Sequence, residues 1–122
     1  MIILDLRGQI KLGTGNVQLR AAIAGLVNRR AKNVLLNLEE VSKIDSSGLG
    51  EIIAAHSSLK KNGGSLKLLN LTTQVRELMV ITKLLTVLDC FKTESDAVRS
   101  FRPFFTSTEG SDQRRMPGYT GL

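Results

Sequence analysis

Apolar residues recur along the chain with two different periods, one typical of strands and the other of helices. Ile2–Ile10 is rich in β-favouring side chains and alternates imperfectly, so it predicts a first strand. Val34–Leu38 is continuously apolar between polar neighbours, which is typical of a central strand covered on both faces. Ser65–Leu71 and Thr86–Phe91 are expected to form further short strands.

The intervening segments have the apolar spacing of helices with one buried face. From about Gly15 to Ala31, apolar side chains recur at i, i+3, i+4 and i+7. Leu49–Lys61 repeats that spacing, and Thr72 and Thr93 are expected to cap two shorter helices through their hydroxyl oxygens. The alternation predicts an α/β fold with a mostly parallel sheet of about four to five strands and about four helices.

The stretch Val41–Gly50 (VSKIDSSGLG) joins the second expected strand to the second expected helix. Asp45, Ser46 and Ser47 place oxygen-bearing side chains where this helix begins. Such side chains favour a helix N-terminus because their oxygens accept hydrogen bonds from its unpaired N–H groups. The glycines that follow remove side-chain bulk. We therefore expect a strand, a short turn and a helix start that presents serine hydroxyls.

Composition predicts one domain over residues 1–102 and a mobile tail over residues 103–122. The chain has 122 residues, a usual size for one domain, and 42% apolar residues with only 4% aromatics predict an aliphatic core. After Pro103 few apolar residues remain and no period is visible, as is typical of a solvated tail.

Charge and hydropathy limit the classes of molecule that the chain is expected to bind. The net charge is +6, which fits an acidic protein or a phosphate-bearing ligand. Basic residues lack interleaved aromatics, which argues against direct nucleic-acid binding, and they are dispersed over several segments as Arg20, Arg29, Arg30, Lys32, Lys60, Lys61 and Lys67. No apolar run approaches the roughly 20 residues of a spanning helix and no signal peptide is visible, so we expect a cytoplasmic protein without membrane insertion.

The residues do not suggest a catalytic, cofactor or metal site. Gly13-x-Gly15 resembles the start of a dinucleotide-binding fingerprint, but Gln18 stands where the third glycine belongs. Helical spacing directs His56 toward the core about two turns from the serines, too far for a catalytic pair. Cys90, the only cysteine, lies in an apolar run and is expected to be a buried thiol. We therefore expect no enzymatic activity, no cofactor and no metal.

Two hypotheses explain the serines at positions 46 and 47. In the first, they only cap the helix. In the second, one of them accepts a phosphoryl group, whose charge of about −1.5 to −2 is stabilised by the positive end of the helix dipole. Such a phosphate would not unfold the helix, so a switch would act on the surface of a partner. Asp45 and Glu51 flank the position and would partly repel the phosphate.

The chain resembles the STAS domain of bacterial anti-sigma factor antagonists. The resemblance is strong over residues 34–101 and weaker toward the N-terminus. It rests on three segments: DSSGLG (Asp45–Gly50), GGSLKLLN (Gly63–Asn70) and ITKLLTVL (Ile81–Leu88). It implies a STAS-like fold and a regulator of transcription that acts by binding.

In that family, the first serine after the aspartate of the DSSGLG-like segment is phosphorylated by a partner anti-sigma factor that is also a serine kinase. The resemblance implies that this serine is Ser46, with Ser47 the lesser candidate. The unphosphorylated form is expected to bind the anti-sigma factor and release the sigma factor, and a phosphatase would reverse the modification. Together with the altered loop at Lys11, the resemblance implies partner contacts at Asp45, Ser46, Ser47, Gly48, Leu49 and Lys11.

The sequence departs from the family in two loops. Lys11, in Gly8–Lys11, stands where an acid is usual, so partner contacts of this loop are expected to differ and Lys11 is a counter-ion candidate for a phosphate on Ser46. Lys83 stands where glycine is frequent and predicts a different turn after the third helix. Two alternatives remain, namely a constitutive STAS interaction module of a transporter or signalling scaffold, and a nucleotide-binding protein.

Overall fold

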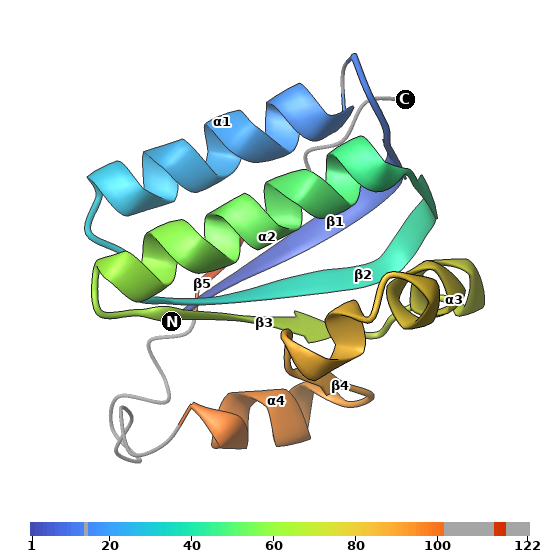
Figure 1. Cartoon of the computed structure of the whole chain (residues 1–122). Helices are drawn as coiled ribbons and strands as arrows, with labels where there is room; N and C mark the ends of the chain where they lie inside the picture. Colours follow the sequence, from blue (N-terminus) through green and yellow to red (C-terminus); the bar gives the residue numbers. More distant parts are fainter. Residues whose placement is uncertain (14, 102–113, 117–122) are drawn as a thin grey trace.

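A parallel sheet forms the centre of the molecule (Figure 1). The computed structural model describes residues 1–13, 15–101 and 114–116. In chain order the elements are β1 (Ile2–Ile10), α1 (Gly15–Asn28), β2 (Asn33–Ile44), α2 (Ser46–Lys61), β3 (Ser65–Leu69), α3 (Thr73–Ile81), the 3₁₀ turn η1 (Leu84–Thr86), β4 (Cys90–Phe91), α4 (Glu94–Ser100) and β5 (Arg114–Met116). The described strands are ordered β4-β3-β2-β1-β5 and every pair is parallel. The predicted α/β class is confirmed.

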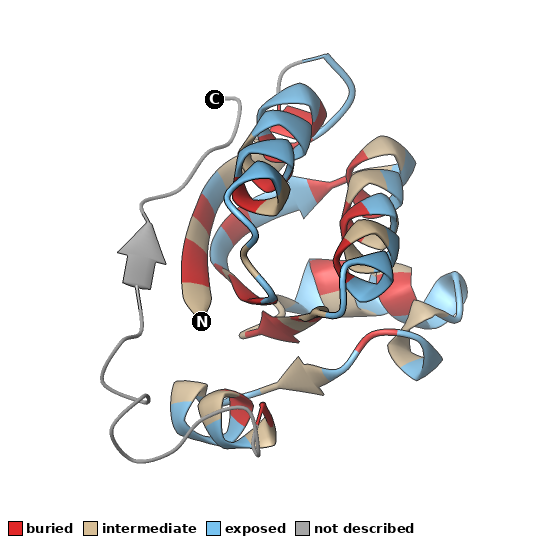
Figure 2. Ribbon diagram, turned by 90° about the vertical axis from the view of Figure 1, so that its left-hand side faces the viewer, coloured by how far each residue is buried: buried red, intermediate tan, exposed pale blue. Residues whose placement is uncertain are grey.

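Helices cover both faces of the sheet and separate two hydrophobic clusters. α1 and α2 lie side by side over one face, and α4 lies over the other (Figure 1). Leu4 and Leu36 belong to the larger cluster beneath α1 and α2, whereas Ile3 and Leu35, one residue earlier on the same strands, belong to the cluster beneath α4. This alternation follows the strand period of two. Figure 2 shows the buried residues of α1 and α2 on the sides that face the sheet.

The second strand extends further than the sequence predicted. The apolar run predicted a strand over Val34–Leu38, but β2 continues to Ile44. Val41 and Ile44 are buried and pair with β1, and register shifts in this pairing interrupt the regular apolar pattern. The expected turn before α2 is therefore reduced to Asp45.

The strand predicted over Thr86–Phe91 is also shorter, since only Cys90–Phe91 are extended. α3 is followed by Lys83 in the left-handed conformation with φ of 62°. The Thr86 hydroxyl donates to the Lys83 carbonyl oxygen at 2.9 Å and closes η1. The residues before Cys90 thus complete a turn that carries the chain from α3 to the edge of the sheet.

The opposite edge of the sheet carries a strand that the sequence did not predict. Arg114–Met116 form β5 and pair in parallel with Ile2, Ile3 and Leu4 of β1. The other residues of the predicted mobile tail, 103–113 and 117–122, lie outside the described residues.

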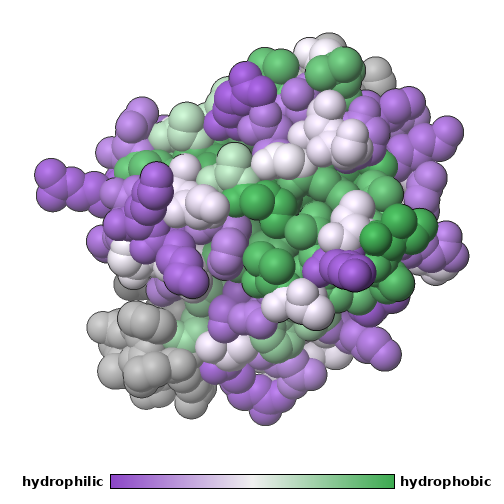
Figure 3. Space-filling view, viewed as in Figure 1, coloured by the Kyte–Doolittle hydropathy of each residue, from purple (hydrophilic) through white to green (hydrophobic). Residues whose placement is uncertain are grey.

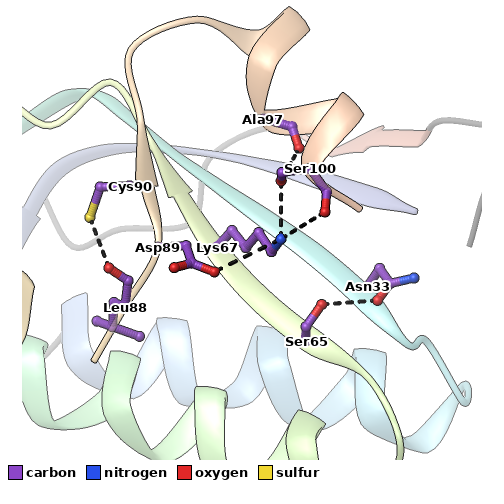
Figure 4. Close-up of polar contacts among 8 residues, drawn as sticks. All are labelled: Asn33, Ser65, Lys67, Leu88, Asp89, Cys90, Ala97 and Ser100. Carbon is purple, nitrogen blue, oxygen red and sulfur yellow. Dashed lines mark hydrogen bonds and ion pairs between the residues drawn. The ribbon is translucent and has the colours of Figure 1, made fainter. Parts of the chain in front are cut away.

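Lys67 of β3 links the sheet to α4 through hydrogen bonds to Ser100. Its side chain is only 14% exposed, and its Nζ donates to the Ser100 carbonyl oxygen at 3.0 Å and to the Ser100 hydroxyl at 3.1 Å (Figure 4). Nζ also lies 3.9 Å from the Asp89 carboxylate and 4.7 Å from the ring centroid of Phe101. The carbonyl end of α4 favours a cation at this position. Lys67 is therefore a structural cation rather than a surface charge.

Substitution of Lys67 by alanine is expected to lower the free energy of unfolding by about 1.5–3 kcal/mol, because it removes charge-assisted hydrogen bonds from a poorly exposed site. Lys92→Ala, at an exposed lysine, serves as the control and is expected to stay within about 0.5 kcal/mol of the native protein. Urea unfolding followed by circular dichroism measures both. Equal effects would contradict the assigned role.

Candidate functional site

Asp45 is the N-cap of α2. Its backbone is extended, with φ of −109° and ψ of −175°, and its Oδ1 accepts a hydrogen bond from the Gly48 N–H at 3.0 Å. Its Oδ2 accepts a hydrogen bond from the Leu12 N–H, also at 3.0 Å. One carboxylate therefore joins the first turn of α2 to the loop between β1 and α1.

The same hydrogen bonds keep Asp45 ionised. The N–H of Leu12, followed by that of Gly48, lowers the pKa of Asp45, and the positive charge of Lys11 lowers it further by a smaller amount. Asp45 is therefore a carboxylate at neutral pH. A negative charge is favourable here because the helix N-terminus carries a partial positive charge.

Ser46 and Ser47 are the first residues of α2, directly after the cap. Ser46 is exposed and Ser47 is partly buried. Neither hydroxyl is hydrogen-bonded to another of the described residues. The hypothesis that the serines cap the helix is therefore wrong, because Asp45 supplies the cap. Ser46 is exposed, and its hydroxyl neither caps α2 nor bonds to another residue within the described part of the chain.

Gly48 allows the first turn of α2 to pack directly on β1. A Cβ at this position would lie 2.2 Å from the Ile10 carbonyl oxygen and 2.7 Å from Cγ1 of Ile44. At Gly50, in contrast, a Cβ would meet nothing within 4 Å. The two glycines of the DSSGLG segment therefore differ: the first permits close packing, and the second has no steric requirement.

The loop between β1 and α1 lies against this turn and is itself held at both ends. The Asp45 N–H donates to the Ile10 carbonyl oxygen at 3.4 Å, and the Asn16 N–H donates to the Lys11 carbonyl oxygen at 3.1 Å. The side chains of Lys11 and Leu12 are exposed, Leu12 to 76%. The loop therefore presents a cation and an apolar side chain beside Asp45.

Arg20 of α1 forms an ion pair with Glu51 of α2, with its Nε donating at 3.0 Å. The hydrogen bond and the charge of Glu51 raise the pKa of Arg20. The Glu51 side chain is only 13% exposed, so its carboxylate interacts with Arg20 and has little contact with solvent. The repulsion that the sequence predicted between Glu51 and a phosphate is thereby reduced, whereas Asp45 stays adjacent.

The structure brings Asp45, Ser46 and Ser47 together with the loop that holds Lys11. Gly48 and Leu49 are buried, Leu49 to 3% exposure, so we expect them to support the turn instead of touching a partner. Sequence reasoning missed Leu12, because its contribution is a main-chain N–H and an exposed apolar side chain. Neither feature leaves a recognisable sequence signal.

The other candidate motifs do not form a second site among the described residues. His56 lies on α2 about 15 Å along the helix from Ser46, and its Nδ1 is buried without a hydrogen-bond partner in the described ranges. A Cβ at Gly15 would lie 2.1 Å from the Gln9 carbonyl oxygen, so packing explains this glycine. Burial raises the pKa of the Cys90 thiol.

The described residues contain no group of three or more His, Cys, Asp or Glu side chains placed to hold a metal ion. None of the helices within them combines the length and the apolar character needed to cross a bilayer.

Comparison with known proteins establishes the family. A model of the STAS domain matches residues 1–97. The chain belongs to the STAS domain family. The anti-sigma-B factor antagonist of Bacillus subtilis (strain 168) is 35% identical to this STAS protein over 88 residues, which cover 72% of this chain and 79% of that protein. The predicted resemblance to anti-sigma factor antagonists is confirmed.

Solved structures of this family share the fold. An anti-sigma factor antagonist from Mycobacterium paratuberculosis superposes with a TM-score of 0.72 at 22% identity, over 82% of this chain and 86% of that one. Bacillus SpoIIAA in its phosphorylated form superposes with a TM-score of 0.63 at 26% identity, over 81% and 89%. A sulfate transporter family protein from Wolinella succinogenes and a SulP transporter STAS domain from Vibrio cholerae match at 16% and 14% identity, which shows the fold alone.

The carboxylate of Asp45 is expected to contribute pH-dependent stability. Because its pKa is lowered on folding, the contribution is complete above the unfolded pKa of about 3.9 and is lost as the pH falls through the folded value. Asp45→Asn keeps an acceptor for Gly48 but removes the charge. We expect this variant to be less stable than the native protein at pH 7, and the difference to shrink below about pH 3.9.

Chemical unfolding at pH 7 and at the lowest pH where both proteins fold measures this difference. Glu77→Gln, at an exposed carboxylate of α3, is the control and is expected to leave the pH dependence unchanged. A stability difference between Asp45→Asn and the native protein that stays constant with pH would refute the assignment.

The two glycines at the start of α2 give a matched pair of substitutions. Gly48→Ala is expected to destabilise the protein by at least about 2 kcal/mol, because the methyl group would overlap the main chain of β1. Gly50→Ala is expected to stabilise it by about 0.5–1 kcal/mol, since alanine is the better helix former and the site is open. Thermal and urea unfolding test both signs; destabilisation by Gly50→Ala would contradict the described packing.

Proposed function

We propose that this STAS protein is an anti-sigma factor antagonist-like regulator, which binds an anti-sigma factor and is switched off by phosphorylation of Ser46. The observation that carries the proposal is the exposed Ser46 hydroxyl in the first turn of α2, beside a cap that Asp45 supplies. The antagonist name of the Bacillus subtilis relative supports the binding role. The phosphorylated form of SpoIIAA, a structural relative, supports a modification in this fold.

A phosphate on Ser46 would leave the fold intact. The hydrogen bonds from Gly48 and Leu12 go to Asp45, so modification of the serine removes neither. The helix dipole stabilises the added negative charge, and Lys11 supplies a nearby cation that offsets part of the repulsion from Asp45. The regulated quantity is therefore the affinity of a partner and not the stability of α2.

Apolar surface next to the serines explains why a partner would respond to the charge. Leu12, whose N–H donates to Asp45, is 76% exposed, and Val17 in the first turn of α1 is 48% exposed. Figure 3 shows more apolar surface between α2 and α3, and Ile81 at the end of α3 is 77% exposed. A dianion at the edge of an apolar contact would lose hydration when the partner binds, and Lys11 offsets only part of its charge, so binding is weakened.

The kinase in this proposal is the anti-sigma factor itself, which transfers the γ-phosphoryl group of ATP to the Ser46 hydroxyl and releases ADP. A phosphatase restores the hydroxyl by hydrolysing the phosphate ester. The STAS protein is then a substrate and a binding partner, and no enzymatic activity is assigned to it. These roles rest on the resemblance of the DSSGLG segment to anti-sigma factor antagonists.

A constitutive STAS interaction module is the second candidate. It is favoured by the fold similarity to a SulP transporter STAS domain and to a sulfate transporter family protein. It is also favoured by Lys11, which departs from the antagonist pattern in the loop beside Asp45. In this case the same surface would bind a partner permanently and Ser46 would not be modified. A similar fold does not by itself decide between the two functions.

Incubation with ATP and the serine-kinase anti-sigma factor of the same genome distinguishes these candidates. Mass spectrometry is expected to locate one phosphate on Ser46, retained in Ser47→Ala and lost in Ser46→Ala. Ser46→Asp is expected to weaken anti-sigma factor binding at least about tenfold while its thermal stability stays equal or rises, since an acid is favoured at the start of a helix.

The absence of phosphate, or unchanged affinity of Ser46→Asp, would refute the switch and favour the constitutive module. Loss of binding together with loss of thermal stability would instead show that the acid acts on the fold.

A further inference from the structure

The ends of α1 and α2 form a second charged surface, far from Ser46. Both helices end on the same side of the molecule (Figure 1). Five exposed basic side chains lie in their last turn or in the loop that follows, and we call them the basic pole: Arg29, Arg30, Lys32, Lys60 and Lys61. They are separated in the sequence, so the fold is what brings them together.

Direct contacts join the two segments that carry these side chains. The Lys32 Nζ donates to the Asn62 carbonyl oxygen at 2.6 Å, and the Ser65 N–H donates to the Lys32 carbonyl oxygen at 2.9 Å. A Cβ at Gly64 would lie 1.8 Å from that same carbonyl oxygen. The loop after α1 and the loop after α2 therefore form one continuous surface.

The charge of the basic pole is not balanced by carboxylates of the described chain. No Asp or Glu occurs in residues 6–38 or 52–76, which contain both loops. The ion pairs of the described residues involve other cations: Arg7–Glu40, Arg20–Glu51, Lys67–Asp89 and Arg99–Asp96. Figure 3 shows hydrophilic side chains projecting at this end of α2.

We propose that the basic pole docks peripherally on the anionic surface of a lipid bilayer. Clustered Lys and Arg side chains are attracted to acidic headgroups without a groove or an inserted segment. The basic pole also lacks the apolar centre of a typical protein interface, because the large exposed apolar side chains of the described residues lie elsewhere: Leu12, Val17, Val80, Ile81 and Val87.

The main chain at the basic pole disfavours nucleic acid as the partner. Nucleic-acid phosphates are often bound closely by main-chain N–H groups and helix N-termini. Here the carbonyl ends of α1 and α2 face outward, and these carry partial negative charge. Long cationic side chains can reach a flat layer of headgroups while the carbonyl groups stay at a distance from it. A nucleic-acid phosphate bound closely by the main chain would instead be repelled by these carbonyl groups.

Docking would leave the serine site free. α2 has 16 residues, so its two ends are about 24 Å apart. The basic pole and Ser46 can therefore bind different partners at once. This proposal does not depend on phosphorylation or on an anti-sigma factor.

Sedimentation of the full chain with vesicles tests the proposal. At low salt, we expect binding to phosphatidylglycerol–phosphatidylcholine vesicles and none to phosphatidylcholine alone. The triple variant Arg29→Gln, Lys60→Gln, Lys61→Gln is expected to bind about a hundredfold more weakly, at about fivefold per cation. The matched control is Lys43→Gln, Lys83→Gln, Lys92→Gln, which removes the same charge from exposed positions elsewhere, with an expected loss below about threefold.

Three results would overturn the proposal: no binding to anionic vesicles, equal weakening by the two triple variants, or tighter binding to a short duplex DNA than to the vesicles. Equal weakening would mean that net charge alone controls binding. Circular dichroism of both triple variants establishes that each is folded before the comparison, and both substitute only exposed side chains.

Discussion

The carboxylate of Asp45 is the interaction on which the arrangement of the site depends. It accepts hydrogen bonds from the N–H groups of Gly48 and Leu12 and so connects α2 with a loop that lies 33 residues earlier. Because Asp45 caps the helix, the Ser46 hydroxyl is left without a structural role among the described residues. The position of the loop with Lys11 and the chemical availability of Ser46 therefore have the same cause.

The helices and the central strands could be predicted from local pattern because their causes are local. Thr72 and Thr93 cap α3 and α4 as predicted, accepting hydrogen bonds from N–H groups three residues later at 3.4 and 3.2 Å. The end of β2 could not be predicted, since the three-residue spacing of Val41 and Ile44 breaks the alternation of a strand. Their burial depends on an irregular pairing with β1. β5 likewise depends on a contact with the far end of the chain.

The sequence located the site but not the division of roles within it. Asp45, Ser46 and Ser47 are all good capping residues, so only the extended backbone of Asp45 decides which one caps. The roles of the cations were equally hidden. Lys67 is held beneath α4, whereas Arg29 and Lys60, equally basic in the sequence, lie on an uncompensated surface. Only the fold determines which of the dispersed basic residues have partners within the protein and which lie together on the surface.

α2 has an acidic residue at its start, Asp45, and basic residues at its end, Lys60 and Lys61. The helix dipole favours both, since it stabilises negative charge at the N-terminus and positive charge at the C-terminus. The formal net charge is +6, so one phosphate of about −2 would leave the protein cationic. Screening at physiological ionic strength acts over about 8 Å, a third of the roughly 24 Å length of α2. A phosphate on Ser46 would therefore be felt by a partner at the first turn and by Lys11, and not by the basic pole.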